Sequence, residues 1–189
     1  MKIKVYIDQG HNPRDFNTGA EGNGLFEQDI TYDIGIRLYN LMRQNPAFDV
    51  RLSRPNEGTI LGTTNSSSLT ARVRDANAWG ADIFLSLHTN AATSSAANGS
   101  EALIYANTST IARELAEDIL DEMTDLTGLR TRGVIERPGL YVLRRTNMPA
   151  VLVEMGFITN PNDAYLMANS PDLFAEGIYR GFLEYYDLQ

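Results

Sequence analysis

The sequence predicts an α/β fold with a largely parallel, centrally buried β-sheet. Two observations support this prediction. Short apolar segments alternate with helix-spaced segments almost throughout the chain, and residues 83–87 and 150–153 form nearly unbroken apolar runs, as strands covered on both faces do. With 189 residues, 43% of them hydrophobic, the chain is long enough to bury one sizeable core. No repeat or linker divides it, so we expect a single domain over residues 1–189.

Six segments have the length and apolar character of strands. The first is a short apolar run directly after the N-terminus, and the last precedes Glu154. In chain order, the predicted strands are residues 3–7, 48–52, 83–87, 102–105, 140–143 and 150–153.

Five segments have helical spacing of apolar residues. In the first, Ile30, Ile34 and Leu38 recur on one face and Pro46 follows the predicted end; Gly80 ends the second. The predicted helices are residues 27–44, 69–79, 111–126, 163–168 and 173–186. Segments rich in small and polar residues predict loops at 12–24, 56–68 and 91–99.

Composition excludes several classes of function. Cysteine is absent, which excludes disulfides, thiolate metal sites and a thiol nucleophile. The formal net charge of -8, with no basic cluster, argues against a nucleic-acid partner. No apolar run approaches the roughly 20 residues of a membrane span. The N-terminus lacks an export signal because Asp8 interrupts the apolar stretch, so we expect another export route or a trimmed leader if the protein acts outside the cell.

Three titratable residues follow predicted strands. His11, His88 and Glu154 come at or just after the ends of strands, and the two histidines are the only ones in the chain. In open α/β sheets, ligands bind beyond the carboxyl ends of the strands. A single histidine at such a position is more often a hydrogen-bonded loop or core residue; two of two, together with a carboxylate, make a shared site about equally plausible.

Two imidazoles and one carboxylate are suited to a catalytic zinc ion, which keeps its fourth position for water. No His-Glu-x-x-His helix is present, so the third ligand must be a separate acid. Residue types alone leave this choice open among Glu21, Glu27, Glu101 and Glu154. Motifs for dinucleotide binding, a phosphate-binding loop or a serine nucleophile are incomplete or absent.

Four spaced motifs resemble the zinc-dependent N-acetylmuramoyl-L-alanine amidases of the Amidase_3 family. They lie at residues 7–11, 18–27, 69–91 and 149–160, in order along nearly the whole chain. The resemblance implies a twisted, mostly parallel sheet of about six strands flanked by helices. It also implies that His11, Glu27 and His88 bind one zinc ion per chain and that Glu154 is the catalytic glutamate. Asn12 and Pro13 depart from the family, where glycines are common.

The resemblance further implies a peptidoglycan hydrolase. Its substrate bond is the amide between the lactoyl group of N-acetylmuramic acid and L-alanine of the stem peptide. Zinc would activate water, and Glu154 would take the water proton as general base and then deliver it to the departing nitrogen. The expected partner is muramyl-peptide substrate, and the expected location is the bacterial cell wall, extracellular or periplasmic. An autolysin, a sporulation enzyme and an endolysin remain equally consistent, and no oligomeric state is predicted.

Several residues near these motifs have two interpretations each. We favour a strand-end turn residue over an acceptor that orients a metal ligand for Asp8, and solvent exposure over a second catalytic acid for Glu101. Arg72 and Asn77 match the family without a derivable role, and packing or a buried hydrogen bond is the preferred interpretation. Asn90 and its loop could line a groove, but a polar surface loop is the default.

Two alternative functions remain. One is another zinc amide hydrolase, such as a peptidoglycan carboxypeptidase, and the other is a non-catalytic wall-sensing module. The second is disfavoured because all predicted metal ligands are retained.

Overall fold

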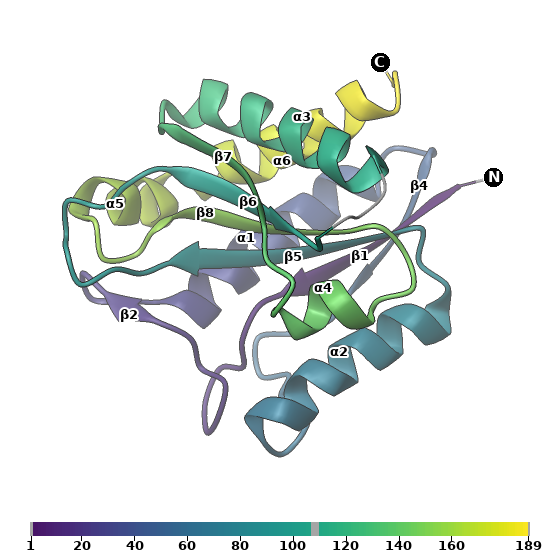
Figure 1. Cartoon of the computed structure of the whole chain (residues 1–189), viewed down its shortest axis with the longest axis horizontal. Helices are drawn as coiled ribbons and strands as arrows, with labels where there is room; N and C mark the ends of the chain where they lie inside the picture. Colours follow the sequence, from purple (N-terminus) through teal and green to yellow (C-terminus); the bar gives the residue numbers. More distant parts are fainter. Residues whose placement is uncertain (1, 107–109, 189) are drawn as a thin grey trace.

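The computed structural model describes residues 2–106 and 110–188. A six-stranded sheet in the order β4-β1-β5-β8-β6-β7 lies between two layers of helices (Figure 1). Neighbouring strands are parallel except for the antiparallel pair β6 and β8. The strands are β1 (Ile3–Gln9), β4 (Phe48–Leu52), β5 (Ile83–Asn90), β6 (Ser100–Ile104), β7 (Thr131–Glu136) and β8 (Ala150–Phe157), with a separate small sheet of β2 (Glu21–Gly22) and β3 (Leu25–Phe26).

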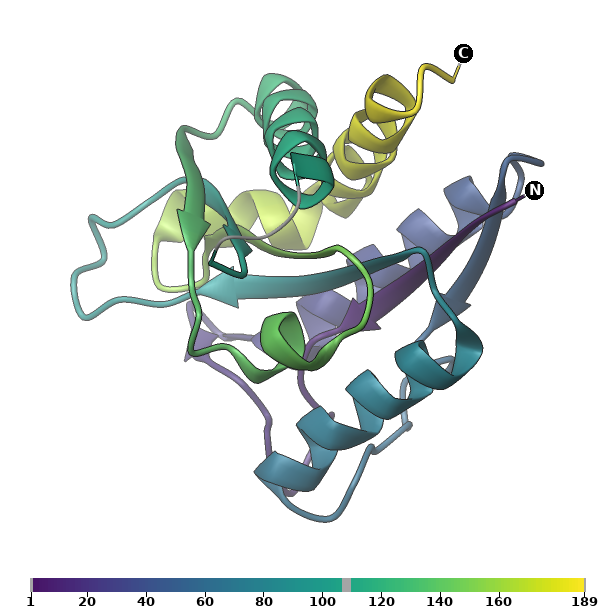
Figure 2. The ribbon, with the colours of Figure 1, turned by 45° about the vertical axis from the view of Figure 1, so that its right-hand side comes forward.

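The helices cover the two faces of the sheet unequally. Figure 2 shows α3 and α6 on one side of the sheet and α2 with the short α4 on the other. The larger core also includes buried residues of α1, whereas the smaller core involves α2 and α4. The helices are α1 (Glu27–Met42), α2 (Asn65–Trp79), α3 (Thr110–Thr127), α4 (Tyr141–Arg145), α5 (Pro161–Asn169) and α6 (Pro171–Tyr185). None of the described helices is long and apolar enough to cross a membrane.

The predicted α/β fold with a mostly parallel six-stranded sheet flanked by helices is confirmed. One predicted strand is wrong: Leu140–Leu143 leads into and forms α4, where Val142 and Leu143 are buried in the smaller core. One strand of the six-stranded sheet was not predicted, because edge strand β7 is polar and partly exposed along its length. The correct number of strands in this sheet therefore came from two errors that offset one another. The two-residue strands β2 and β3 were also not predicted, and β2 lies in the predicted loop at 12–24.

Helix α2 begins inside a segment predicted as a loop. Thr64 is its N-cap: its side chain accepts a hydrogen bond from the Ser67 amide, and the Ser67 hydroxyl accepts one from the Thr64 amide in return. Such a capping box satisfies amides that would otherwise lack partners in the first turn. This starts the helix four residues before the apolar spacing becomes visible at Leu69.

Side chains alternate between the two faces of the sheet along the central strands, and this alternation decides which residues enter the larger core and which reach the polar site. In β8, Val151 and Val153 belong to the larger core, and Leu152 belongs to the smaller one. Successive side chains in a strand point to opposite faces. Glu154 therefore lies on the face covered by α2 and α4, as does His88 at the matching position of β5. His88 and Glu154 thus lie at the edge of the smaller core.

Candidate metal centre

His88 and Glu154 are adjacent because their strands pair directly. Their Cα atoms are partners in the parallel register of β5 and β8, and both residues lie within these strands, not beyond them as predicted. On the other side of His88, the Gly10 amide donates to the Leu87 carbonyl and extends the pairing of β1 with β5. A Cβ atom at position 10 would lie only 2.5 Å from Cε1 of His88, so the ring packs directly on glycine backbone.

Three side chains converge at one point. Nε2 of His11 lies 3.1 Å from Oε1 of Glu27, and Nδ1 of His88 lies 3.0 Å from the same oxygen. The two imidazole nitrogens are 3.1 Å apart. These three residues also form a group whose ligand atoms could hold a metal ion. The fold therefore brings together residues from β5, from the start of α1 and from the loop after β1.

Glu27 is the first residue of α1, as predicted, and its carboxylate is held from both sides. Oε1 accepts a hydrogen bond of 2.9 Å from the Thr89 amide, and Oε2 accepts one of 2.8 Å from the Ala20 amide. Burial alone would raise the pKa of this carboxyl, but hydrogen bonds and charge from His11 and His88 outweigh it and hold the pKa well below its ordinary value. The Glu27 carboxyl is therefore ionised, which is the form that can coordinate a cation.

His11 follows β1 in an unusual backbone conformation. Its φ angle is 68°, in the left-handed region that costs a non-glycine residue about 1–2 kcal/mol. Its Nδ1 lies 3.2 Å from the Asn17 carbonyl oxygen. A carbonyl can only accept, so in the neutral ring Nδ1 carries the proton and Nε2 presents a lone pair to Glu27. Two acceptors that face each other at this distance require a cation or a proton between them.

The His88 ring is suited to the same role. Burial lowers its pKa, and proximity to His11 lowers it further, while Glu27 acts in the opposite direction. The net lowering favours the neutral imidazole, which is the form that coordinates metals.

Glu154 has a buried carboxyl oxygen without a hydrogen-bond partner among the described residues. This atom is Oε2, and burial followed by the charges of Glu27 and Glu101 raises the pKa of the carboxyl to about 8. The nearby carboxylates thus add to the effect of burial on this pKa. A divalent cation held by His11, Glu27 and His88 would act in the opposite direction and favour the ionised form of Glu154.

Glu101 is buried, with 5% of its surface exposed, so the prediction of a solvent-facing side chain is wrong. Nε of Arg132 donates to Oε2 at 2.7 Å, and Nδ2 of Asn90 donates to Oε1 at 3.0 Å. Arg132 belongs to the unpredicted strand β7, which explains the error. Asn90 is the last residue of β5 and is tied to Glu101. Glu21, the remaining candidate ligand, is exposed in β2.

Asp8 and Arg72 form a buried ion pair beneath the site. Nη1 of Arg72 and the Ser86 hydroxyl donate to the two oxygens of Asp8. The prediction of a turn residue for Asp8 is therefore wrong, whereas the buried hydrogen bond predicted for Arg72 is confirmed. Asn77 differs from it: on the protein surface it donates to the Arg145 carbonyl and accepts from the Asn147 amide.

A cavity of about 100 Å³ adjoins the two histidines on the α2 and α4 side. Apolar side chains form one wall and the polar site forms the other, so a small uncharged group of a ligand would fit beside the metal ligands. It is lined by Asp8, Gly10, His11, Asn17, Leu69, Arg72, His88, Leu140, Tyr141, Val142 and Leu152.

The three donor atoms fit a zinc ion. Ligands about 2.0–2.1 Å from a tetrahedral zinc lie about 3.3 Å from each other, close to the separations of 3.0–3.1 Å seen here. Two neutral imidazoles and one carboxylate are also a donor set of catalytic zinc sites, which leave a position for water. The arrangement can therefore support metal-assisted hydrolysis with Glu154 at hand as a proton carrier.

Comparison with known proteins identifies the family of this chain. The family model described as N-acetylmuramoyl-L-alanine amidase, Amidase_3, matches residues 5–184. The chain is 39% identical over 186 residues to the N-acetylmuramoyl-L-alanine amidase LytC of Bacillus subtilis, covering 96% of this chain and 35% of LytC. It is 37% identical over 180 residues to the amidase CwlM of Bacillus licheniformis, covering 95% of this chain and 65% of CwlM. The chain thus spans about a third of one relative and just under two thirds of the other.

A solved structure shares the whole fold. The crystal structure of an N-acetylmuramoyl-L-alanine amidase from Clostridium difficile 630 superposes with a TM-score of 0.88 and 32% sequence identity. The match covers 98% of this chain and 97% of that one. The family match over nearly the whole length, the relatives above 30% identity and this shared architecture agree: the chain belongs to the Amidase_3 family of N-acetylmuramoyl-L-alanine amidases.

Proposed function

We propose that this protein hydrolyses the amide bond between the lactoyl group of N-acetylmuramic acid and L-alanine of the stem peptide in peptidoglycan. The observation that carries the proposal is the convergence of His11, Glu27 and His88 at 3.0–3.1 Å beside the unpartnered carboxyl of Glu154. Family membership supports the choice of bond, since the matching relatives are named for this activity.

His11, Glu27 and His88 would hold one zinc ion. When bound, zinc would supply a Lewis acid that acidifies water and polarises the scissile carbonyl. The chain prepares its ligands for this: the Asn17 carbonyl fixes the His11 tautomer, and the Thr89 amide helps hold the Glu27 carboxylate in place. Neutral histidines and an ionised glutamate are the protonation states that coordination requires.

Glu154 would act as general base and then as general acid. Its free Oε2 is available to accept the proton of the attacking water. The same carboxyl would then give that proton to the amide nitrogen as the bond to L-alanine breaks, because an amide anion is too basic to leave unprotonated. Burial and the nearby carboxylates favour the protonated form of Glu154, which suits the second step.

We propose that residues 1–189 form one catalytic amidase domain, which acts on peptidoglycan at the bacterial cell wall. The acidic chain, with a net charge of -8, fits a glycopeptide substrate and not a nucleic acid. The alternative zinc hydrolase, a carboxypeptidase, would use the same metal ligands and differs only in the bond that it cuts.

Digestion of purified sacculi followed by mass spectrometry tests the bond. Free stem peptides that begin at L-alanine support the amidase, and loss of a terminal D-alanine identifies the carboxypeptidase instead. An intact, metal-loaded protein that releases neither product would indicate the wall-sensing module. Metal analysis of dialysed protein should give about one zinc per chain, lost in the His11→Ala, His88→Ala double variant.

A further inference from the structure

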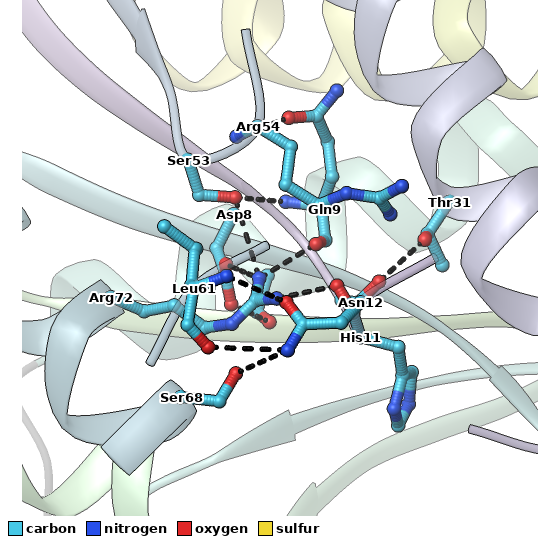
Figure 3. Close-up of polar contacts among 12 residues, drawn as sticks. Asp8, Gln9, His11, Asn12, Thr31, Ser53, Arg54, Leu61, Ser68 and Arg72 are labelled. Carbon is cyan, nitrogen blue, oxygen red and sulfur yellow. Dashed lines mark hydrogen bonds and ion pairs between the residues drawn. The ribbon is translucent and has the colours of Figure 1, made fainter. Parts of the chain in front are cut away.

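The side chain of Arg72 lies in the protein interior, directly below the His11 loop. Only 1% of its surface is exposed, although it originates from α2, a helix that contributes no ligand to the metal centre. In Figure 3 its guanidinium lies between Asp8 and Asn12, and the ring of His11 points away from this cluster. Within the described part of the chain, none of its hydrogen bonds is with the ring itself, and its hydrogen bond to His11 is with the main-chain carbonyl.

The two ends of the guanidinium contact successive parts of one chain segment. Nη1 donates to Asp8 and, at 2.7 Å, to the Gln9 carbonyl. Nη2 donates to the His11 carbonyl and, at 3.3 Å, to Oδ1 of Asn12. One planar group therefore spans the end of β1 and the turn that follows it (Figure 3).

This turn is where His11 adopts its left-handed conformation. Without a side-chain donor, the His11 carbonyl would be directed into the interior unpaired, and residues other than glycine favour negative φ. Arg72 supplies the donor that makes the turn favourable. The left-handed turn then sets the direction in which the His11 side chain leaves the backbone, so that its ring points toward Glu27 and His88.

Asn12 holds the same turn from the other side. It is fully buried, its Oδ1 accepts from the Leu61 amide at 3.1 Å, and its Nδ2 donates to the Leu61 carbonyl and to Ser68. Ser68 lies in α2 one turn before Arg72. Helix α2 therefore holds the His11 loop through two side chains, and the family-atypical Asn12 belongs to that attachment.

We propose that Arg72 is a positioning residue for the metal centre: its guanidinium holds the main chain of His11 in the left-handed turn that directs Nε2 to the ligand position. This inference rests on the proposed metal-dependent function. It assigns a role to a residue that matches the family pattern and whose hydrogen bond to His11 is with the main chain, not the ring.

A lysine cannot reproduce this arrangement. Its ammonium is a single point with three donors, whereas the guanidinium is a rigid fork whose two ends serve acceptors on Asp8, Gln9 and His11 at once. Arg72→Lys keeps the charge opposite Asp8 and removes the fork. We expect zinc to bind about 10–100-fold more weakly, as for other changes that disturb the support of a metal ligand.

The test measures zinc affinity of the purified chain by competition with a chromogenic chelator, together with the visible absorption of the Co²⁺-loaded protein. Arg72→Lys should weaken zinc binding and alter the tetrahedral Co²⁺ bands. The matched control is Ile119→Ala, which creates a cavity in α3 within the larger core and lowers the unfolding temperature of the apo protein without reaching the His11 loop. Its zinc affinity should equal that of the wild type.

A second variant guards against loss of folding. Arg72→Met with Asp8→Asn removes both buried charges, leaves no uncompensated ion and should show the same loss of zinc affinity. Wild-type affinity in either Arg72 variant would overturn the inference while leaving the proposed function intact. An equal loss in Ile119→Ala would also overturn it, since general destabilisation would then explain the effect. Absence of zinc binding in the wild type would overturn both proposals.

Discussion

Glu101 and Glu154 lie directly opposite one another on the antiparallel strands β6 and β8. Arg132 neutralises Glu101, but Oε2 of Glu154 has no partner. Like charges on paired strands are unfavourable, and here Arg132 neutralises one of the two. The pair therefore leaves a single buried carboxyl whose proton affinity is raised, beside the proposed metal centre.

Glu154→Gln should abolish most activity without loss of zinc. The amide keeps the size of the side chain but cannot accept and return the proton, so the rate on sacculi should fall by about 100- to 10,000-fold. Dye release from labelled sacculi measures the rate, and metal analysis of the same sample measures the zinc. A variant that digests sacculi as fast as the wild type would refute the role of general base.

Arg132→Met should destabilise the protein through Glu101. It leaves an almost fully buried carboxylate with Asn90 as its one remaining side-chain donor among the described residues, which should lower the free energy of unfolding by about 1–3 kcal/mol. The matched control is Arg113→Met, because Arg113 pairs with Glu136 on the surface, where both side chains are exposed and loss should cost under about 1 kcal/mol. Urea denaturation compares them. Equal losses in the two variants would contradict the buried role of Glu101.

Gly10→Ala should disturb the centre through the ring of His88. The new Cβ would lie 2.5 Å from Cε1 of His88 and 2.6 Å from the Leu87 carbonyl oxygen, so ring or strand must shift. We expect weaker zinc binding and lower activity. Gly139→Ala is the control, because a Cβ there meets nothing within 4 Å and the change should stay within about 0.5 kcal/mol. Unchanged zinc affinity in Gly10→Ala would show that the ring does not depend on this contact.

Acid should destabilise the protein partly through Asp8. Burial would raise the pKa of this carboxyl, but the charge and hydrogen bonds of Arg72 outweigh it, so the folded pKa lies below the unfolded value of about 3.9. The unfolded state therefore binds the proton first. The contribution is complete above about pH 4–5 and is lost as the pH falls through the folded pKa, with a slope of about 1.4 kcal/mol per pH unit.

Urea titrations across this acid range measure the Asp8 contribution. The Asp8→Asn variant should be less stable at neutral pH and should lack this part of the slope. A variant whose stability falls with acid as steeply as that of the wild type would assign the acid sensitivity to other carboxyl groups.

The sequence predicted the arrangement of the fold and the proximity of His88 to Glu154. Unbroken apolar runs marked β5 and β8, and the polar residues that interrupt them, His88 and Glu154, turned out to be direct neighbours. Local patterns suffice to locate these two strands because the apolar residues themselves mark them.

Side-chain contacts between distant segments could not be predicted from the sequence. The polar edge strand β7 has no apolar run, and without it the arginine partner of Glu101 could not be seen. Arg72 likewise pairs with Asp8 across 64 positions, a contact that no local pattern encodes. The apolar spacing at 140–143 suits a strand or a short helix equally, and packing on the smaller core decides for α4.

Because side chains alternate along β8, the direction of the Glu154 carboxyl is fixed by the same register that places Val151 and Val153 in the larger core. Deleting or inserting one residue between Ala150 and Glu154 would exchange the two faces of the strand. The Glu154 carboxyl would then point into the larger hydrophobic core beneath α3 and α6, and valine side chains would face the proposed metal centre. Deleting or inserting two residues would leave each side chain on its original face of the sheet. Length variation among functional descendants of this chain should therefore accumulate in the connections between strands and spare this one.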